Sequence, residues 1–139
     1  MGSRKQGTPK KPRIVLDGSV YLLLMCIDGV EVYKVGVTAK TVGGRCLGII
    51  ESVWSVYGYF PRVEILFQER TRHHYEVESE IHRVLRERGY SYRSGLEFSG
   101  STELFHGIEL KDILKVMREC LDAGGNVSKE SVDRISTVM

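Results

Sequence analysis

The chain has 139 residues, enough for one domain with a hydrophobic core, and its 42% hydrophobic share and mean hydropathy of −0.16 exclude a disordered polymer. No run reaches the ~18 uncharged apolar residues of a membrane span, so we expect no membrane contact. Three widely spaced cysteines without a CxxC pair argue against a disulfide framework or a zinc site and favour reduced thiols in a cytoplasm.

The positive charge is concentrated at the N-terminus. Residues 1–13 contain five basic and no acidic side chains, so residues 14–139 keep 15 basic against 18 acidic ones. The five are Arg4, Lys5, Lys10, Lys11 and Arg13. A basic arm of this kind can follow the phosphates of a nucleic acid, although a solubilising tail has the same composition. We expect residues 1–16 to be a flexible basic tail.

Two apolar runs flank an Asp-Gly dipeptide at 28–29, which predicts a β-hairpin over about 19–37. Side chains alternate between the two faces of a strand, so the hairpin register decides which residues share a face. With this turn Tyr21 faces Gly36, Leu23 faces Lys34, and all four lie on one face. A phenol and an ammonium are then diagonal neighbours, about 7–8 Å apart at Cα, beside a glycine that leaves space for the ring.

A helix is predicted to follow the hairpin, with Thr38 or Thr41 as its N-cap. Its apolar side chains recur at helical spacing: Val42, Cys46, Ile49, Ile50 and Val53. Arg45 falls at the rim of this buried face. Three glycines at 43, 44 and 48 weaken the helix by about 1 kcal/mol each relative to alanine.

The second half of the chain predicts one strand and two further helices. Alternation through Val63, Ile65 and Phe67 indicates a third strand. A helix over about 72–88 ends at Gly89, and a last helix over about 109–123 buries Leu110 with four other apolar residues. Between them, 89–107 is expected to be a long loop. We therefore predict an α+β domain over 17–125, with a small, mainly antiparallel three-stranded sheet flanked by helices, and a C-terminal tail or short helix over 126–139.

Four short motifs resemble those of the GIY-YIG nuclease superfamily, over about residues 18–106. The match is closest to the phage-type branch, whose second motif reads YKIG, so that lysine stands where many members have a second tyrosine. The motifs are Ser19-Val20-Tyr21, Tyr33-Lys34-Val35-Gly36, the helical E-x-x-x-H at Glu78–His82, and Glu103-Leu104-Phe105, where leucine replaces the tryptophan of E-W-F.

The resemblance implies metal-dependent hydrolysis of DNA phosphodiester bonds. Glu78 would bind a magnesium or manganese ion (Mg²⁺ or Mn²⁺), because a hard cation prefers carboxylate and water oxygens. Arg45 would clamp the phosphate with its guanidinium. Tyr21 and Lys34 would orient or activate the attacking water. Tyr21 either deprotonates this water, which requires a cation to lower the phenol pKa, or only positions it.

Further candidates remain open. Superfamily members often carry another His or Tyr after the arginine, and the spacing does not choose between Tyr57 and Tyr59. His82 shares the helix margin of Glu78 and could contact phosphate. Tyr92 and Arg93 could stack on or clamp a nucleic acid, and simple loop packing explains them equally well. For the segment Glu103-Leu104-Phe105 we expect a packing role, and the alternative is that Glu103 is catalytic.

Two other functions stay open. A non-catalytic nucleic-acid-binding module on the same fold agrees with the net acidic body and with Lys34, and a protein-interaction domain of phage or bacterial origin needs neither DNA nor metal. A nuclease with one such site would need a homodimer or two successive nicks to break both strands of DNA. The expected location is the cytoplasm of a bacterial or phage-infected cell.

Overall fold

The computed structural model describes residues 17–27, 29–95, 97 and 103–124. In chain order the elements are β1 (Gly18–Ile27), β2 (Val30–Thr38), α1 (Val42–Tyr57), β3 (Arg62–Thr71), α2 (His74–Glu87), β4 (Ser91–Tyr92), β5 (Leu104–Phe105) and α3 (Leu110–Asp122). The expected basic tail and the C-terminal segment 126–139 lie outside the described residues.

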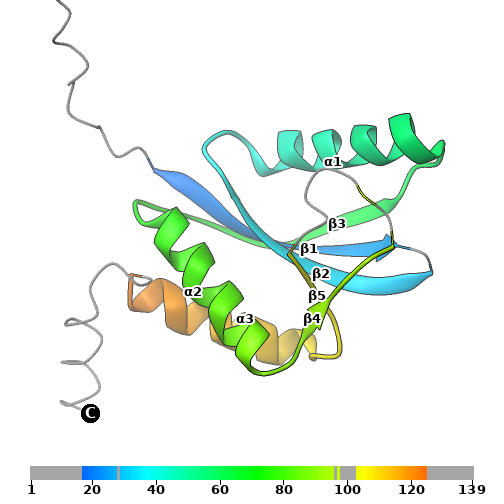
Figure 1. Cartoon of the computed structure of the whole chain (residues 1–139). Helices are drawn as coiled ribbons and strands as arrows, with labels where there is room; N and C mark the ends of the chain where they lie inside the picture. Colours follow the sequence, from blue (N-terminus) through cyan, green and yellow to red (C-terminus); the bar gives the residue numbers. More distant parts are fainter. Residues whose placement is uncertain (1–16, 28, 96, 98–102, 125–139) are drawn as a thin grey trace, which may run out of the picture.

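The strands form one antiparallel sheet in the order β3-β1-β2-β5-β4, so the protein has an α+β fold. Helix α1 lies on one side of the sheet, and α2 and α3 lie on the other (Figure 1). The predicted hairpin register is confirmed, because Tyr21 pairs with Gly36 and Leu23 with Lys34. β1 is an interior strand, as its apolar residues on both faces require.

The predicted three-stranded sheet is wrong, because the described sheet has five strands. The segment 89–107, expected to be a loop, contains β4 and β5, and β5 pairs with β2 at Tyr33 and Lys34. A two-residue strand is too short to show an alternating pattern, so only the tertiary pairing reveals it. Since β5 ends opposite Lys34, the edge of β2 beyond that residue has no strand beside it in the described structure.

The helix boundaries agree with the sequence patterns to within a few residues. Thr41 caps α1, since its Oγ1 accepts a hydrogen bond of 3.0 Å from the Gly44 amide. Gly58, with a φ of 76°, ends the helix in the left-handed conformation. No helix in the described ranges has the length and apolar character needed to cross a bilayer.

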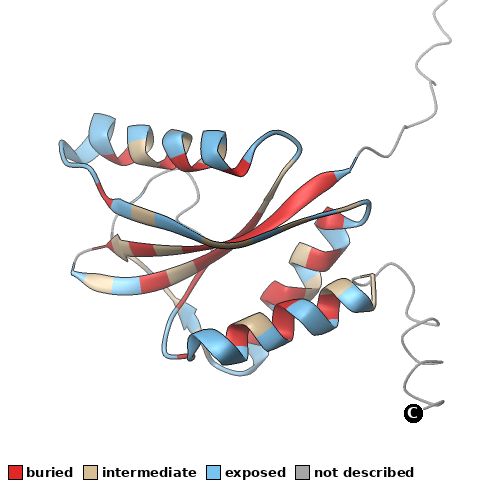
Figure 2. Ribbon diagram, turned by 180° about the vertical axis from the view of Figure 1, so that it is seen from behind, coloured by how far each residue is buried: buried red, intermediate tan, exposed pale blue. Residues whose placement is uncertain are grey.

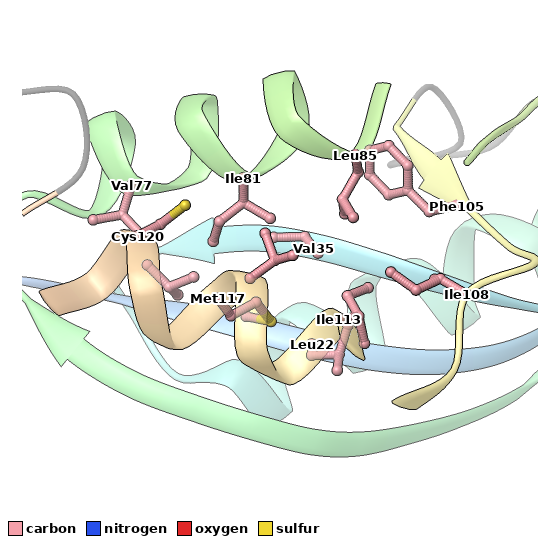
Figure 3. Packing of buried hydrophobic residues seen from close by; sticks show 12 residues of the cluster. Leu22, Val35, Val77, Ile81, Leu85, Phe105, Ile108, Ile113, Met117 and Cys120 are labelled. Atoms are coloured by element: carbon pink, nitrogen blue, oxygen red, sulfur yellow. The ribbon is translucent and has the colours of Figure 1, made fainter. Parts of the chain in front are cut away.

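The sheet separates two hydrophobic cores. One lies under α1, and the other lies between the sheet and the pair α2–α3 (Figures 2 and 3). In the second core Val77, Ile81 and Leu85 of α2 are fully buried, as their spacing predicts. Leu110 was predicted to be buried and is instead 40% exposed, because the core-facing side of α3 begins one turn later, at Ile113.

Candidate active site

Tyr21 is buried in the middle of the sheet, opposite a glycine. Its side chain is only 1% exposed, on the α1 side of β1. A Cβ atom on Gly36 would lie 2.5 Å from the Cζ atom of the Tyr21 ring, which is closer than real side chains approach. The second motif therefore requires its glycine because the phenol of the first motif occupies the space beside it.

Arg45 brings a cation to this phenol from the first turn of α1. Its guanidinium donates a side-chain hydrogen bond to Tyr21. Burial raises the pKa of Tyr21 above its ordinary value, while the hydrogen bond and charge of Arg45 lower it and the nearby carboxylate of Glu78 raises it further. The lowered pKa that water deprotonation by Tyr21 requires is thus not found, which favours a positioning role for a protonated phenol.

Lys34 is buried on the same side of the sheet, with 6% of its surface exposed. Burial lowers the pKa of the Lys34 ammonium, and the charge of Arg45 lowers it as well, whereas Glu78 and Glu103 raise it. The two carboxylates partly compensate for placing this cation away from water. The ammonium thus lies within electrostatic reach of two carboxylates and a guanidinium.

His82 fixes α2 against the open edge of β2. Its Nε2 lies 2.7 Å from the backbone oxygen of Val35, so we assign the proton to Nε2, which donates to that carbonyl. The other nitrogen, Nδ1, is 3.7 Å from a carboxylate oxygen of Glu103. Because no strand accompanies β2 at this point in the described structure, the histidine takes the place of a ladder partner.

Glu78 lies one helical turn before His82 and reaches the same edge. Its Oε2 is 3.9 Å from Nε2 of His82, and its side chain is 25% exposed. Its charge acts on both Tyr21 and Lys34, so α2 delivers a carboxylate to a site built mainly on the opposite side of the sheet. The fold thus brings together Tyr21, Lys34, Arg45, Glu78 and His82, with Glu103 at the margin.

Of the remaining candidates, Tyr57 and Tyr59 lie away from this group of side chains. Tyr57 is twelve residues after Arg45, about 18 Å along the helix, and its hydroxyl accepts a hydrogen bond of 2.7 Å from the Glu97 amide. Tyr59 lines a cavity beside Cys26, at the far end of β1. Tyr92 lies two strands from Lys34 on the same face of the sheet, since it pairs with Leu104 and Leu104 pairs with Lys34. Its ring centroid is 4.7 Å from that of His106, and Arg93 is exposed. The five basic residues of the tail lie outside the described residues.

The donor set at Glu78 suits a hydrated divalent cation. Among the described residues no three His, Cys, Asp or Glu side chains gather into a cluster that could enclose a metal ion. Magnesium commonly binds through one or two carboxylates and completes its coordination with water and substrate phosphate. Glu78, whose side chain is 25% exposed, could supply one such carboxylate ligand, and the described residues form no closed all-protein cage.

Sequence reasoning missed a group of cations around this end of the sheet. Ser19 pairs with Thr38 on one side and with Arg70 on the other, so the ends of β2 and β3 flank the start of β1. The exposed cations here are Lys40, Arg70 and Arg72. Within the described ranges none of the three has a carboxylate within 4.0 Å. The signal was available, since each lies at a strand end that the antiparallel order brings together.

Comparison with known proteins gives one family. A family model described as the T5orf172 domain matches residues 18–121, which includes every described strand and nearly all of α3. No curated protein and no solved structure matches the chain.

Proposed function

The chain belongs to the T5orf172 domain family, a phage-associated family among the GIY-YIG and HNH-like nuclease-related clans, and on this premise we propose that it is a metal-dependent endonuclease that hydrolyses DNA phosphodiester bonds. One observation carries the proposal. Side chains from four elements lie close enough to interact electrostatically. The guanidinium of Arg45 (α1) and the carboxylate of Glu78 (α2) both shift the pKa values of the Tyr21 phenol (β1) and the Lys34 ammonium (β2).

The cations of the site suit a phosphodiester. Arg45 is the natural phosphate clamp, because a guanidinium can donate two parallel hydrogen bonds to a phosphate and offset charge that develops in the transition state. Its bond to Tyr21 holds the guanidinium in place before substrate arrives. Around the site, Lys40, Arg70 and Arg72 provide an exposed cationic rim for the neighbouring phosphates.

The other roles follow from burial and charge. Glu78 would hold a Mg²⁺ or Mn²⁺ ion, which supplies compensation for negative charge on the reacting phosphate. Tyr21, whose pKa is raised by burial, keeps its proton at neutral pH and positions the attacking water. Lys34 lies beside it and donates hydrogen bonds to the same water or to a phosphate oxygen.

The decisive test uses supercoiled plasmid with Mg²⁺ or Mn²⁺ and the Glu78→Gln variant. We expect the wild type to nick the plasmid and E78Q to lose at least about 10²-fold in rate, since the substitution removes the metal-binding charge. The matched control is Glu76→Gln on the same helix, whose exposed carboxylate lies outside the site. Equal cleavage by the wild type and E78Q would remove the mechanism.

A second candidate, a nucleic-acid-binding module without turnover, is favoured by one observation. Burial raises the pKa of Tyr21, so the site does not favour the phenolate that would deprotonate water. A purified protein that retards DNA in a gel but nicks none with any divalent metal would establish this function instead.

A homodimer is also part of the proposal. One set of side chains makes one active site, so a double-strand break needs two copies or two successive nicks. If two copies act together, linear plasmid should appear without a lag and its yield should rise with the square of protein concentration. Nicked circles that accumulate first would indicate single copies acting in sequence.

A further inference from the structure

A second surface gathers exposed aromatic side chains, away from the site described above. Nine large hydrophobic residues are exposed among the described residues, and six of them fall between positions 47 and 60. These six are Leu47, Trp54, Val56, Tyr57, Tyr59 and Phe60. Four of them belong to α1, and Tyr59 and Phe60 belong to the segment that connects α1 to β3 (Figure 1). Contiguous exposed apolar patches on a monomer mark binding surfaces, and the part of this set for which a contact is established is the Trp54–Phe60 pair.

Two of these rings already form a stack. The centroids of Trp54 and Phe60 are 4.5 Å apart and their planes differ by only 3°. Trp54 is 48% exposed and Phe60 is 67% exposed, so the pair is open to solvent. A further planar ring can therefore extend the stack on an open ring face. We call Trp54, Tyr59 and Phe60 the aromatic shelf.

A cavity beside the shelf adds space and charge. It has a volume of about 350 Å³ and is lined by Cys26, Gly29, Tyr59, Phe60, Pro61 and Arg62. Arg62 is the one charged residue among these six. Its guanidinium lies 3.4 Å from a carboxylate oxygen of Glu64, and both side chains are largely exposed, so the pair is weak and can exchange for a phosphate. Aromatic walls next to a cation are complementary to a base and its phosphate.

We propose that the aromatic shelf binds an unpaired nucleobase, so that the protein prefers nucleic acid with a single-stranded segment. Cys26 pairs with Arg62, and Tyr21 lies five residues earlier on β1, which places the shelf about 17 Å from the phenol along the strand. This distance corresponds to about five stacked nucleotides. As a statement about the nuclease substrate, the proposal rests on the proposed function. Base binding itself does not depend on catalysis.

The protein carries its own reporter, because Trp54 is the only tryptophan of the chain. We would titrate the full chain with an oligothymidylate of 15 nucleotides, and separately with a blunt DNA duplex of equal length. Both titrations would contain EDTA, which chelates divalent cations and so prevents cleavage. Stacking of a base on the shelf should quench the tryptophan emission with the single strand and leave it nearly unchanged with the duplex. Unchanged emission at concentrations where anisotropy shows the labelled oligonucleotide to be bound would overturn the proposal.

Three variants distinguish base stacking from nonspecific hydrophobic binding. Phe60→Leu keeps the apolar bulk but removes the ring, and should weaken single-strand binding by about 5- to 140-fold, which is 1–3 kcal/mol converted at 1.4 kcal/mol per tenfold. Phe60→Tyr keeps the ring and should bind like the wild type. Leu47→Ala removes a similarly exposed apolar side chain from α1, outside the aromatic shelf, and should also bind normally.

The outcomes distinguish the two proposals. Equal binding by F60L and the wild type would exclude base stacking even if plasmid nicking is normal. Concentration-dependent dimers that F60L and L47A both abolish would instead assign the surface to a second copy of the chain. Quenching by the single strand in a protein that nicks nothing would support the shelf and disprove the nuclease.

Discussion

The ring of Tyr21 fills the space in which a Cβ atom on Gly36 would lie, and that atom would come within 2.5 Å of Cζ. The two residues are direct partners in the antiparallel ladder of β1 and β2. The last residue of the first motif and the last residue of the second are therefore one structural unit. Changing either should affect the site through the other.

Gly36→Ala should displace the Tyr21 ring and its hydrogen bond with Arg45. We expect the free energy of unfolding to fall by about 1–3 kcal/mol, the usual cost of overpacking a core. The matched control is Gly48→Ala in α1, where an added Cβ meets nothing within 4 Å. That variant should gain about 1 kcal/mol from helix propensity. Urea denaturation measures both, and effects of the same sign would contradict the steric explanation.

Lys34→Met should separate stability from activity. Burial lowers the pKa of Lys34 in the folded protein, so between that pKa and the unfolded value near 10.5 the unfolded chain binds more protons. The stability of the wild type should therefore rise, relative to K34M, as the pH increases through this window. At pH 7 the variant should be at least as stable as the wild type while losing nicking activity.

Chemical denaturation of both proteins at several pH values between 7 and 10 tests this prediction. The tyrosines are common to the two proteins, so their titration largely cancels in the difference. Parallel stability profiles would show that the Lys34 ammonium is not penalised by burial. A K34M variant that nicks normally would remove the lysine from the proposed mechanism.

His82→Phe should leave the backbone oxygen of Val35 without its 2.7 Å partner at the open edge of β2. A buried acceptor without a partner costs about 1–3 kcal/mol, so the variant should unfold at lower urea concentration. His106→Phe changes an exposed ring and should alter stability by less than about 0.5 kcal/mol. If both variants unfold at the wild-type midpoint, His82 does not hold α2 against the sheet.

The three thiols should differ widely in reactivity. Burial raises the pKa of Cys120 to about 12, so at pH 8 only about one thiol in 10⁴ is ionised, and its side chain is 7% exposed. Cys46 is equally buried, and burial also raises its pKa. Cys26 is half-buried and should react first with a disulfide reagent. Loss of the fast phase in Cys26→Ser, with a slow phase remaining, is the expected result.

The sequence predicted the hairpin, its register and the three helices because each carries a local signal. An Asp-Gly turn sets the pairing of Tyr21 with Gly36, and apolar spacing of 3.6 residues marks the helices. The β4–β5 pair was missed because two-residue strands have no period to detect. Leu110 was misplaced because the apolar pattern continues beyond the point at which α3 meets its neighbours.

Sequence alone determined which chemical groups the chain offers and which of them share a strand face, since alternation along a hairpin is a local property. Only the tertiary structure decided how α2 packs against the open edge of β2. There His82 contacts the backbone oxygen of Val35, and Glu78 lies within electrostatic reach of Tyr21 and Lys34 on the other side of the sheet. It also decided that Tyr57 and Tyr59 lie away from Tyr21. Contacts between distant segments depend on how helices pack across the sheet, and no local pattern encodes that packing.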